Sequence, residues 1–383
     1  MKLWDAIIVG AGPAGCAAAY DLARSGREVL LLDRAEFPRQ KACAGGLTSK
    51  TVRALRYPVA PVTRQTLAHI RIETPDSKST VLRRHDDYCF MTVRQELDDY
   101  CFRQTLAAGA QFRRIRAITG IAEEGDRISL EVNLDAGGET LQAGYLIGAD
   151  GVHSQVRQLL FGKNPEWFWR GFALEACARV PDAARQDLLF DFAPVRDGYG
   201  WIFPKGDHVN VGLYSYSGNE KIDRTRLAAY VRSRFGDVPA EDMIGQYAGF
   251  GAARHMIPAG RAFLVGDAGG FVDPLTGEGI YFAVVSGQAA AGAVESALRS
   301  GAPAYLLFAE ATAKLRADLA LSTSGARWFY NNLEQGCNLL SVPGIKGVAV
   351  RAFAEGLNLS GLAERVRKLL SLRIPRQWAP NRC

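Results

Sequence analysis

Short, almost wholly apolar runs bounded by glycines and polar residues mark the beginning of the chain. The first is Ala6–Val9, and Arg27–Asp33 (REVLLLD) contains the second. Such runs are typical of parallel strands that are buried on both faces. The segment between them, Cys16–Gly26, reads CAAAYDLARSG and is expected to form a helix that stops at its Ser-Gly end. The pattern therefore predicts a strand–helix–strand unit at the N-terminus.

Strand-like and helical patterns alternate along the rest of the chain. Tyr57–Cys89 is irregular but contains the strand-like pieces HIRIETP and STVLRR, whereas Val93–Gly109 has helical periodicity. Two strands, RISLEVNL and YLIGADG, follow, and Trp167–Gly251 predicts a region of mixed strands. A further apolar strand, in AFLVGDAGG, precedes a long helix that starts at Gly279, and helices are expected from there to the end.

A GxGxxG motif lies where the first strand gives way to the first helix. Gly10 makes the tight turn, Gly12 lets the backbone approach a diphosphate, and Gly15 lets the helix pack closely on the strand. The open helix N-terminus attracts phosphate, and Asp33, which ends the second strand, accepts hydrogen bonds from ribose hydroxyls. The motif predicts dinucleotide binding, and the expected contacts also include Pro13, Ala14 and Arg34.

The chain is long enough for two domains, since single hydrophobic cores stop growing at about 250–300 residues. Segments of a nucleotide-binding domain are interrupted by segments rich in strands. The predicted class is α/β, with a Rossmann-like cofactor domain interleaved with a sheet-rich substrate domain and followed by a helical region. The predicted boundaries are 1–57, 90–166 and 252–300 for the cofactor domain, 58–89 and 167–251 for the substrate domain, and 301–383 for the helical region.

Composition excludes several other classes of protein. Seven cysteines without paired CxxC spacing, and five scattered histidines, predict neither a metal site nor a disulfide framework. The longest uncharged run, Gly279–Val294, is too short to span a bilayer, which needs about 20 residues. The first strand begins within five residues of Met1, so no cleavable signal peptide is expected. These features favour a cytoplasmic protein.

Positive charge is concentrated at the C-terminus, although the net charge of +6 is mild. In LAERVRKLLSLR the apolar side chains Leu362, Val366, Leu369 and Leu370 fall on one helical face and the charged ones elsewhere. Such a helix either covers the protein's own core or docks on the inner face of an anionic membrane. A nucleic-acid partner is not expected.

Later motifs indicate that the dinucleotide is FAD. Gly148–Gly151 (GADG), with Ser154 and Arg157, resembles a pattern of flavin hydroxylases of the p-hydroxybenzoate hydroxylase-like superfamily. Val265–Ala268 (VGDA) resembles the second FAD motif of that superfamily. The resemblance implies an FAD domain of the glutathione-reductase-2 type. Asp150 and Gly151 are either cofactor contacts or braces of the domain. The other expected FAD contacts are Arg94, Ile118, Asp267, Pro274, Gly277, Gly279 and Ile280, in addition to Cys43, Ala44 and Gly46.

Two segments narrow the resemblance to the geranylgeranyl reductase family. They are Lys41–Gly46 (KACAGG) and Tyr199–Pro204 (YGWIFP), which resemble the family's Cys/Gly-rich loop beside the flavin and its YxWxFP-type motif. The resemblance covers most of the chain to about residue 300 and implies FAD-dependent saturation of prenyl double bonds in lipid metabolism. It also implies an electron donor, for which NAD(P)H or a reduced ferredoxin is expected.

The alternating aromatic residues Tyr199, Trp201 and Phe203 place three planar side chains on one face of a strand that Pro204 ends. One interpretation is an apolar slot that binds a prenyl chain opposite the flavin. The alternative is a buried strand whose aromatic rings only fill the core. Tyr199, Trp201, Phe203 and Pro204 are the predicted substrate contacts.

Cys43, Tyr199 and Trp201 are the candidate catalytic residues. The Cys43 thiol is a candidate proton donor after hydride transfer, but a buried free cysteine in a tight loop is also common. Tyr199 and ordered water are alternative donors. Two other functions stay open: a flavin monooxygenase or halogenase, and an electron-transfer flavoprotein that reduces a quinone. Tyr199 and Phe203 depart from the WxWxIP motif of halogenases, which favours the reductase.

Overall fold

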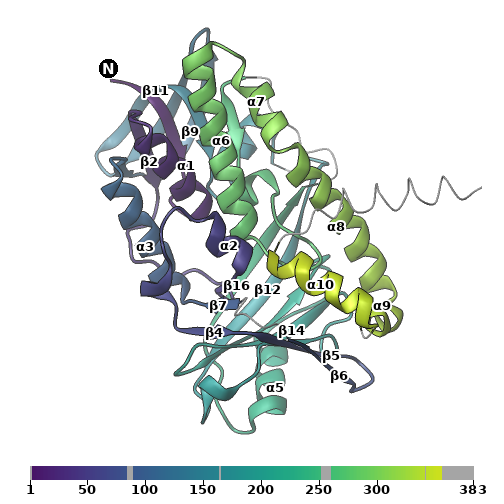
Figure 1. Cartoon of the computed structure of the whole chain (residues 1–383). Coiled ribbons are helices and arrows are strands. Elements are labelled where there is room, and N and C mark those ends of the chain that lie inside the picture. Colours follow the sequence, from purple (N-terminus) through teal and green to yellow (C-terminus); the bar gives the residue numbers. More distant parts are fainter. Residues whose placement is uncertain (1, 84–88, 164, 252–259, 341, 356–383) are drawn as a thin grey trace, which may run out of the picture.

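The computed structural model describes residues 2–83, 89–163, 165–251, 260–340 and 342–355 of the chain. Two predictions therefore lie outside the described residues: the amphipathic basic helix at 362–373, and residues 252–259 of the third cofactor-domain segment. Within the described part, two seven-stranded sheets meet at an angle, and a run of helices spans both (Figure 1). The α/β class predicted from the sequence is confirmed.

The first sheet is mostly parallel and is built around the N-terminal strand. It runs β8-β2-β1-β11-β10-β9, and β17 pairs with β11. The pairs β1–β2, β2–β8, β1–β11 and β11–β17 are parallel, whereas β9–β10 and β10–β11 are antiparallel. The strands are β1 (Leu3–Val9), β2 (Val29–Asp33), β8 (Gln111–Arg114), β9 (Ala117–Glu124), β10 (Arg127–Leu134), β11 (Gly137–Gly148) and β17 (Ala262–Leu264).

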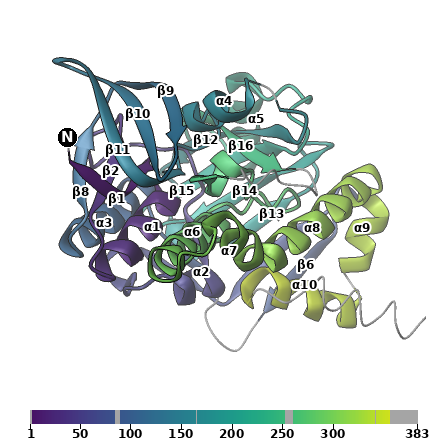
Figure 2. The same ribbon diagram turned by 90° about the horizontal axis from the view of Figure 1, so that it is seen from above.

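Successive side chains of β1 point to opposite faces of the sheet, and those on both faces are apolar and covered. Ala6 and Ile8 pack against helices, whereas Ile7 and Val9 pack into a core with β9, β10 and β11. The helices on the first side include α1 (Pro13–Arg24), α3 (Arg94–Ala107) and α6 (Ile280–Ser300), and Figure 2 shows them beside the sheet. On the other side, α4 (Gln155–Phe161) contacts β9.

The second sheet runs β16-β12-β15-β14-β13-β5-β6 and is antiparallel except at β5–β13. A small sheet, β3-β7-β4, lies beside it. The strands of the second sheet are β5 (His69–Glu73), β6 (Ser79–Arg83), β12 (Phe168–Ala178), β13 (Leu189–Asp191), β14 (Gly198–Pro204), β15 (Val209–Ser215) and β16 (Glu241–Gly251), and those of the small sheet are β3 (Gly46–Thr48), β4 (Gln65–Leu67) and β7 (Cys89–Met91).

The two faces of the second sheet have different partners. Leu174, Ile202 and Val211 pack with α5 (Arg224–Phe235), whereas the aromatic side chains of β14 point to the opposite face. That second face joins a core with Phe329 and Tyr330 of α8. The remaining helices are α2 (Ser49–Ala54), α7 (Ala304–Ala311), α8 (Ala313–Asn331), α9 (Leu333–Leu340) and α10 (Pro343–Glu355).

The pattern of mixed strands predicted for Trp167–Gly251 was incomplete, because α5 lies within it. Asp223 caps this helix by accepting a hydrogen bond from the Arg226 N–H, 2.9 Å away. Leu227, Tyr230 and Val231 are its buried residues, at helical spacing. Both signals are present in the sequence. Strand β9 was also missed.

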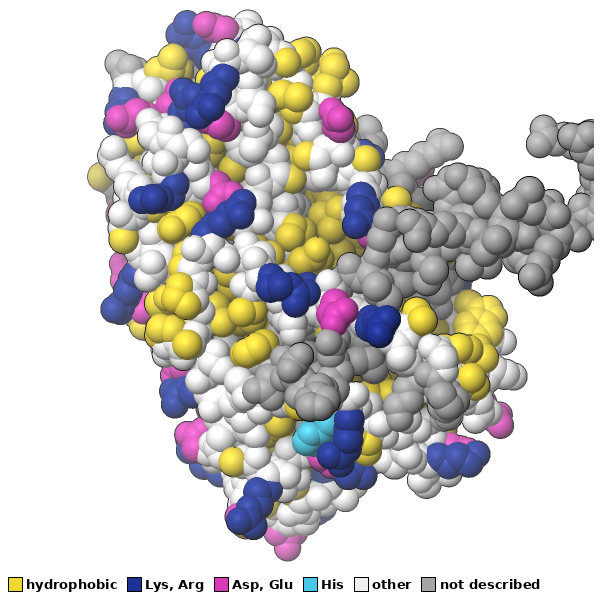
Figure 3. Space-filling view, viewed as in Figure 1, with side chains coloured by type: hydrophobic (Ala, Val, Ile, Leu, Met, Phe, Trp, Pro, Cys, Tyr) yellow, Lys and Arg dark blue, Asp and Glu magenta, His cyan; other side chains and the backbone are white. Residues whose placement is uncertain are grey.

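No helix among the described residues is long and apolar enough to cross a membrane. Figure 3 shows the face along which α6 to α10 run, with basic and apolar side chains interspersed on it. Several apolar side chains of α8 to α10 are exposed, among them Trp328 at 47% and Ile345 at 41%.

Candidate active site

A cavity of about 470 Å³ lies between the first sheet and the second. Its lining combines the GxGxxG turn, the loop around Cys43, the starts of α3 and α6, and the aromatic face of β14. The structure thus brings together motifs that are up to 270 residues apart in the sequence. The predicted residues that line it are Gly10, Gly12, Pro13, Ala14, Asp33, Arg34, Cys43, Ala44, Gly46, Arg94, Asp150, Gly151, Tyr199, Trp201, Phe203, Asp267, Gly277, Gly279 and Ile280.

Two glycines at the start of α1 have no room for a side chain. A Cβ on Gly15 would lie 1.7 Å from the Gly10 carbonyl oxygen, and one on Gly10 would lie 2.3 Å from that of Ala149. Gly10 also has a φ of +101°, a conformation that favours glycine. The turn therefore holds β1, α1 and the end of β11 in close contact. The N-cap residue Gly12 places no side chain over the helix N-terminus, which stays open to the cavity.

Asp33 fixes this turn from the end of β2. Its carboxylate accepts hydrogen bonds from the N–H groups of Ala11, at 2.6 Å, and Ala35, at 2.8 Å. The side chain also lines the cavity. The carboxylate has further lone pairs beyond these two bonds, so it remains able to accept from a ligand hydroxyl.

Asp150 both lines the cavity and braces the fold. Its Oδ2 accepts from the Gln155 N–H at 2.6 Å, and its Oδ1 accepts from the Ser154 hydroxyl. These bonds cap α4. Burial raises the pKa of Asp150. From α4, Arg157 donates to the Ala268 carbonyl at 3.0 Å and so joins the two FAD-type motifs.

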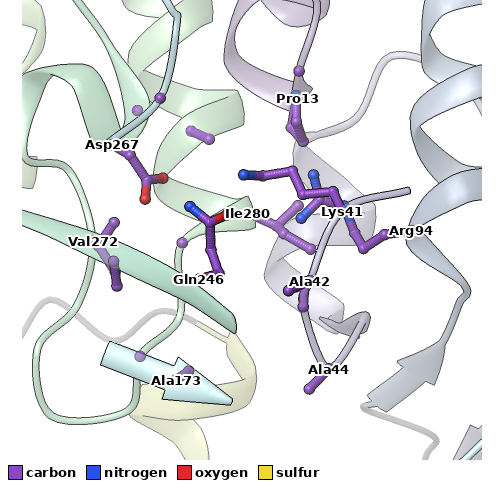
Figure 4. Close-up of a pocket in the computed structure, with 18 of the residues that line it drawn as sticks. Pro13, Lys41, Ala42, Ala44, Arg94, Ala173, Gln246, Asp267, Val272 and Ile280 are labelled. Atoms are coloured by element: carbon purple, nitrogen blue, oxygen red, sulfur yellow. The ribbon is translucent and has the colours of Figure 1, made fainter. Parts of the chain in front are cut away.

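The second helix N-terminus at the cavity belongs to α6. Its N-cap residue, Gly279, provides no side-chain cap, and Ile280 lines the cavity. Asp267 points into the same space, and burial raises the pKa of its carboxyl group. In Figure 4, Lys41 extends from the facing loop toward the region between Pro13 and Asp267. Burial lowers the pKa of Lys41.

Arg94 is held in place by the acid four residues later in α3. Its Nε and Nη2 donate to the two carboxylate oxygens of Asp98, each at 2.8 Å, and Arg39 contacts Asp98 at 3.1 Å. Asp98 is buried, and Arg94 is only 7% exposed. Asp98 therefore fixes the guanidinium groups of Arg94 and Arg39 at the cavity wall.

The lining fits an anionic dinucleotide such as FAD. Two open helix N-termini face the cavity, and each favours a negative charge. Four basic side chains that line the same cavity add positive charge: Arg34, Arg39, Lys41 and Arg94. The GxGxxG turn and Arg34 would hold the diphosphate end, and Gly277 to Ile280 would hold the flavin end.

One wall of the cavity is aromatic. Tyr199, Trp201 and Phe203 are each less than 10% exposed and line the cavity from one face of β14. The Tyr199 hydroxyl donates to the Thr276 carbonyl oxygen, and the Trp201 Nε1–H donates to Asn210 Oδ1 at 2.7 Å. These rings also belong to the core shared with α8, so they both fill the core and shape the cavity.

The loop that carries Cys43 is fixed to the second sheet by two charged residues that the sequence analysis did not select. The Cys43 N–H donates to Glu175 Oε1 at 2.9 Å, and Lys205 Nζ donates to the Ala44 carbonyl oxygen. Both side chains are less than 10% exposed. The Cys43 thiol itself accepts from the Gly45 N–H, with an N–S distance of 3.4 Å.

Four of the predicted contacts do not line the cavity. Gly15 acts through the α1 turn, and Pro204 ends β14. Pro274 accepts from the Tyr214 hydroxyl at 3.0 Å, which helps to shape the wall. Ile118 is buried in the core beneath β9, and Ile115 takes its place at the cavity.

The sequence analysis also missed several residues at the site, which include Arg39, Glu175, Lys205, Gln246 and Val272. All of these except Lys205 line the cavity.

Comparisons with known proteins agree with this geometry. Residues 4–324 match the FAD binding domain family. An uncharacterised protein of Methanosarcina barkeri is 32% identical over 97% of this chain and 95% of its own length. A geranylgeranyl diphosphate reductase of Rhodobacter capsulatus is 32% identical over 80% of this chain and 79% of its own length.

Solved structures share the fold over nearly the whole chain. A geranylgeranyl bacteriochlorophyll reductase-like protein of Thermoplasma acidophilum has a TM-score of 0.78 at 20% identity, covering 95% of this chain and 99% of its own. A flavin-dependent brominase has a TM-score of 0.76 at 15% identity, covering 97% and 100%. The family model and the reductase relatives together decide the assignment, and the chain belongs to the geranylgeranyl reductase family of FAD-dependent oxidoreductases.

Proposed function

We propose that this enzyme saturates isolated double bonds of a prenyl chain. The observation that carries the proposal is the composition of the cavity, whose lining combines basic side chains and open helix N-termini with a wall of aromatic rings. A polyisoprenoid chain is apolar and carries no group that needs a hydrogen bond, so it suits the aromatic wall. The relatives named as geranylgeranyl diphosphate reductases support the same substrate class.

The residues of the chain would bind, orient and shield the substrate. When bound and reduced, FAD would supply the hydride for one carbon of the double bond. Tyr199, Trp201 and Phe203 would hold the chain flat and exclude water from the reacting carbons. The N-terminus of α6 would stabilise negative charge at the flavin end of the cavity. NAD(P)H or a reduced ferredoxin is the proposed source of electrons.

A peripheral contact with the membrane would bring the enzyme to a lipid substrate. Supporting it are exposed apolar side chains of α8 to α10, of which Figure 3 shows a group near α9. The predicted basic helix at 362–373 would add attraction to anionic lipid. We therefore place the enzyme in the cytoplasm, with reversible association with the inner membrane face. Co-sedimentation with anionic vesicles tests this part of the proposal.

The test of the proposed reaction is mass spectrometry of prenyl substrates incubated with the chemically reduced enzyme, with and without air. Geranylgeranyl diphosphate and a menaquinone are the starting substrates. Products that are heavier by pairs of hydrogens and form without oxygen would support the reductase. Oxygen insertion that occurs only in air would instead indicate a monooxygenase. Quinone reduction with no change in the prenyl chain would indicate an electron-transfer flavoprotein.

A further inference from the structure

A carboxyl group lies at the end of the aromatic wall. Trp201, Gly212 and Glu175 are paired across β14, β15 and β12, so the three residues form one row on the sheet. A Cβ on Gly212 would lie only 2.1 Å from the Trp201 ring. The indole ring therefore lies over Gly212 and extends toward the strand that carries Glu175. Ala173, two residues before Glu175, lines the same cavity, as strand alternation requires.

The position of this carboxyl group is fixed from two sides. Oε1 of Glu175 accepts the Cys43 N–H at 2.9 Å. Lys205, the residue after β14, donates to the Ala44 carbonyl oxygen, so the loop is anchored both at β12 and just beyond the end of β14. Glu175 is 8% exposed and Lys205 is 3% exposed. Two side chains that normally carry charge are thus buried beside the loop.

The second oxygen of Glu175 is available for chemistry. Oε2 is buried and makes no hydrogen bond of normal geometry to any described residue, although Glu175 lines the cavity. Burial raises the pKa of Glu175, and the Cys43 N–H, the Asn210 side chain and the charges of Lys205 and Arg94 act in the opposite direction. Burial also lowers the pKa of Lys205, to about 8. A raised pKa favours the neutral carboxyl group, which carries an O–H that can donate.

The alternative proton donors are less well placed. The Tyr199 hydroxyl proton already bonds to the Thr276 carbonyl oxygen, and burial raises the pKa of Tyr199 further. The Cys43 sulfur accepts a hydrogen bond from Gly45. Oε2 of Glu175, in contrast to the Tyr199 hydroxyl, is buried and has no hydrogen-bond partner of normal geometry among the described residues.

We propose that Glu175 protonates the prenyl double bond and that Lys205 and the Cys43 loop position it. This inference rests on the proposed function. As the π bond breaks, one carbon forms a C–H bond with the hydride that reduced FAD supplies, and the other forms a C–H bond with the Glu175 proton. The O–H electron pair stays on Glu175 as a carboxylate, which takes a proton from water before the next turnover. The alkene gains two hydrogens, and the flavin is oxidised by two electrons.

The principal test compares Glu175→Gln with the same substitution at Glu124, an exposed residue of β9. Glutamine keeps the size of the side chain and an oxygen that accepts the Cys43 N–H, so the loop should stay in place. We expect Glu175→Gln to slow single-turnover prenyl reduction by at least about 100-fold, the usual minimum for loss of a general acid. Glu124→Gln, at an exposed position that does not line the cavity, should stay within about threefold of the wild type. The flavin absorbance spectrum is the control for cofactor binding.

A second measurement does not depend on turnover. Infrared difference spectra of the wild-type holoenzyme at neutral pH should show the carbonyl band of a protonated carboxyl group, and the band should disappear in Glu175→Gln. The rate of prenyl reduction should fall as the pH rises through the pKa of Glu175. Removing the charge of Lys205, in Lys205→Met, should raise that pKa and shift the fall to higher pH. Arg94 and the Cys43 thiol are unchanged in this variant.

The outcomes separate the two proposals. If the wild type reduces prenyl substrates and Glu175→Gln does so at the same rate, Glu175 is not the proton donor. A wild type without the infrared band also overturns the assignment, because an ionised carboxylate has no proton to give. If the wild type shows the band but reduces no prenyl substrate, the proposed function fails and the proton donation that rests on it fails as well.

Discussion

Gly212 shows how one missing side chain shapes the aromatic wall. Its backbone runs under the Trp201 indole ring, and an added Cβ would lie 2.1 Å from that ring. No rotation of a flexible side chain relieves this contact, because Trp201 Nε1–H is bonded to Asn210 at 2.7 Å. The size of a single residue therefore determines where the indole ring can lie.

We predict that Gly212→Ala is destabilising and impairs prenyl reduction. Forcing extra volume into a packed core costs about 1–3 kcal/mol. The displaced indole ring should also lower kcat/KM. The control is Gly138→Ala, also in a strand, where the nearest atom to an added Cβ is 3.7 Å away. Urea unfolding of both variants measures the difference, and equal stabilities would contradict the packing argument.

At the scale of elements, the contact between α1 and α6 positions both open helix N-termini. Gly287 of α6 lies against the backbone of α1, and a Cβ there would be 2.2 Å from the Ala14 carbonyl oxygen. Since backbone atoms cannot swing away, α6 would have to move. Gly292, five residues further along α6, has nothing within 4 Å of an added Cβ.

We therefore predict that two alanine substitutions in α6 differ in their effect on FAD affinity. Gly287→Ala should lower the affinity for FAD at least tenfold, because it separates the two helix N-termini that face the cavity. Gly292→Ala should leave FAD affinity unchanged and stabilise the protein by about 0.5–1 kcal/mol, the usual gain for this change in a helix. Fluorescence titration of the apoprotein with FAD measures both. Normal affinity in Gly287→Ala would show that α6 can shift without effect.

The same scale shows what could be predicted from the sequence. The strand–helix–strand unit at Ala6–Asp33 was predictable because its apolar runs and glycines lie within one short segment. Glu175 and Lys205 were not selected, because their importance depends on which strands pair: Glu175 reaches Trp201 only through the register across Gly212. Ile118, predicted as a cofactor contact, does not line the cavity, whereas Ile115, three residues earlier, does.

At the scale of the whole molecule, buried acids and exposed acids respond to pH in opposite directions. Burial raises the pKa of Asp150, Glu175, Asp267 and Glu278, which all line the cavity. The folded state holds these protons more tightly than the unfolded chain does. Their stabilising contribution is therefore complete at low pH and is lost as the pH rises through the raised values. Exposed acids such as Asp76, with a pKa lowered to about 2, contribute stability that is lost only on acidification.

We predict that the free energy of unfolding of the apoprotein is lower at pH 8 than at pH 5, because the folded state holds the protons of the buried acids more tightly than the unfolded chain does. Glu278→Gln is the matched test. Glu278 forms an ion pair with Lys50 at 2.6 Å and accepts from the Thr48 hydroxyl at 2.9 Å, and glutamine keeps the oxygen that accepts from Thr48. The variant should lose less stability between the two pH values than the wild type does. Urea unfolding at both values decides this, and a wild-type stability that rises steadily with pH would show that the exposed acids dominate.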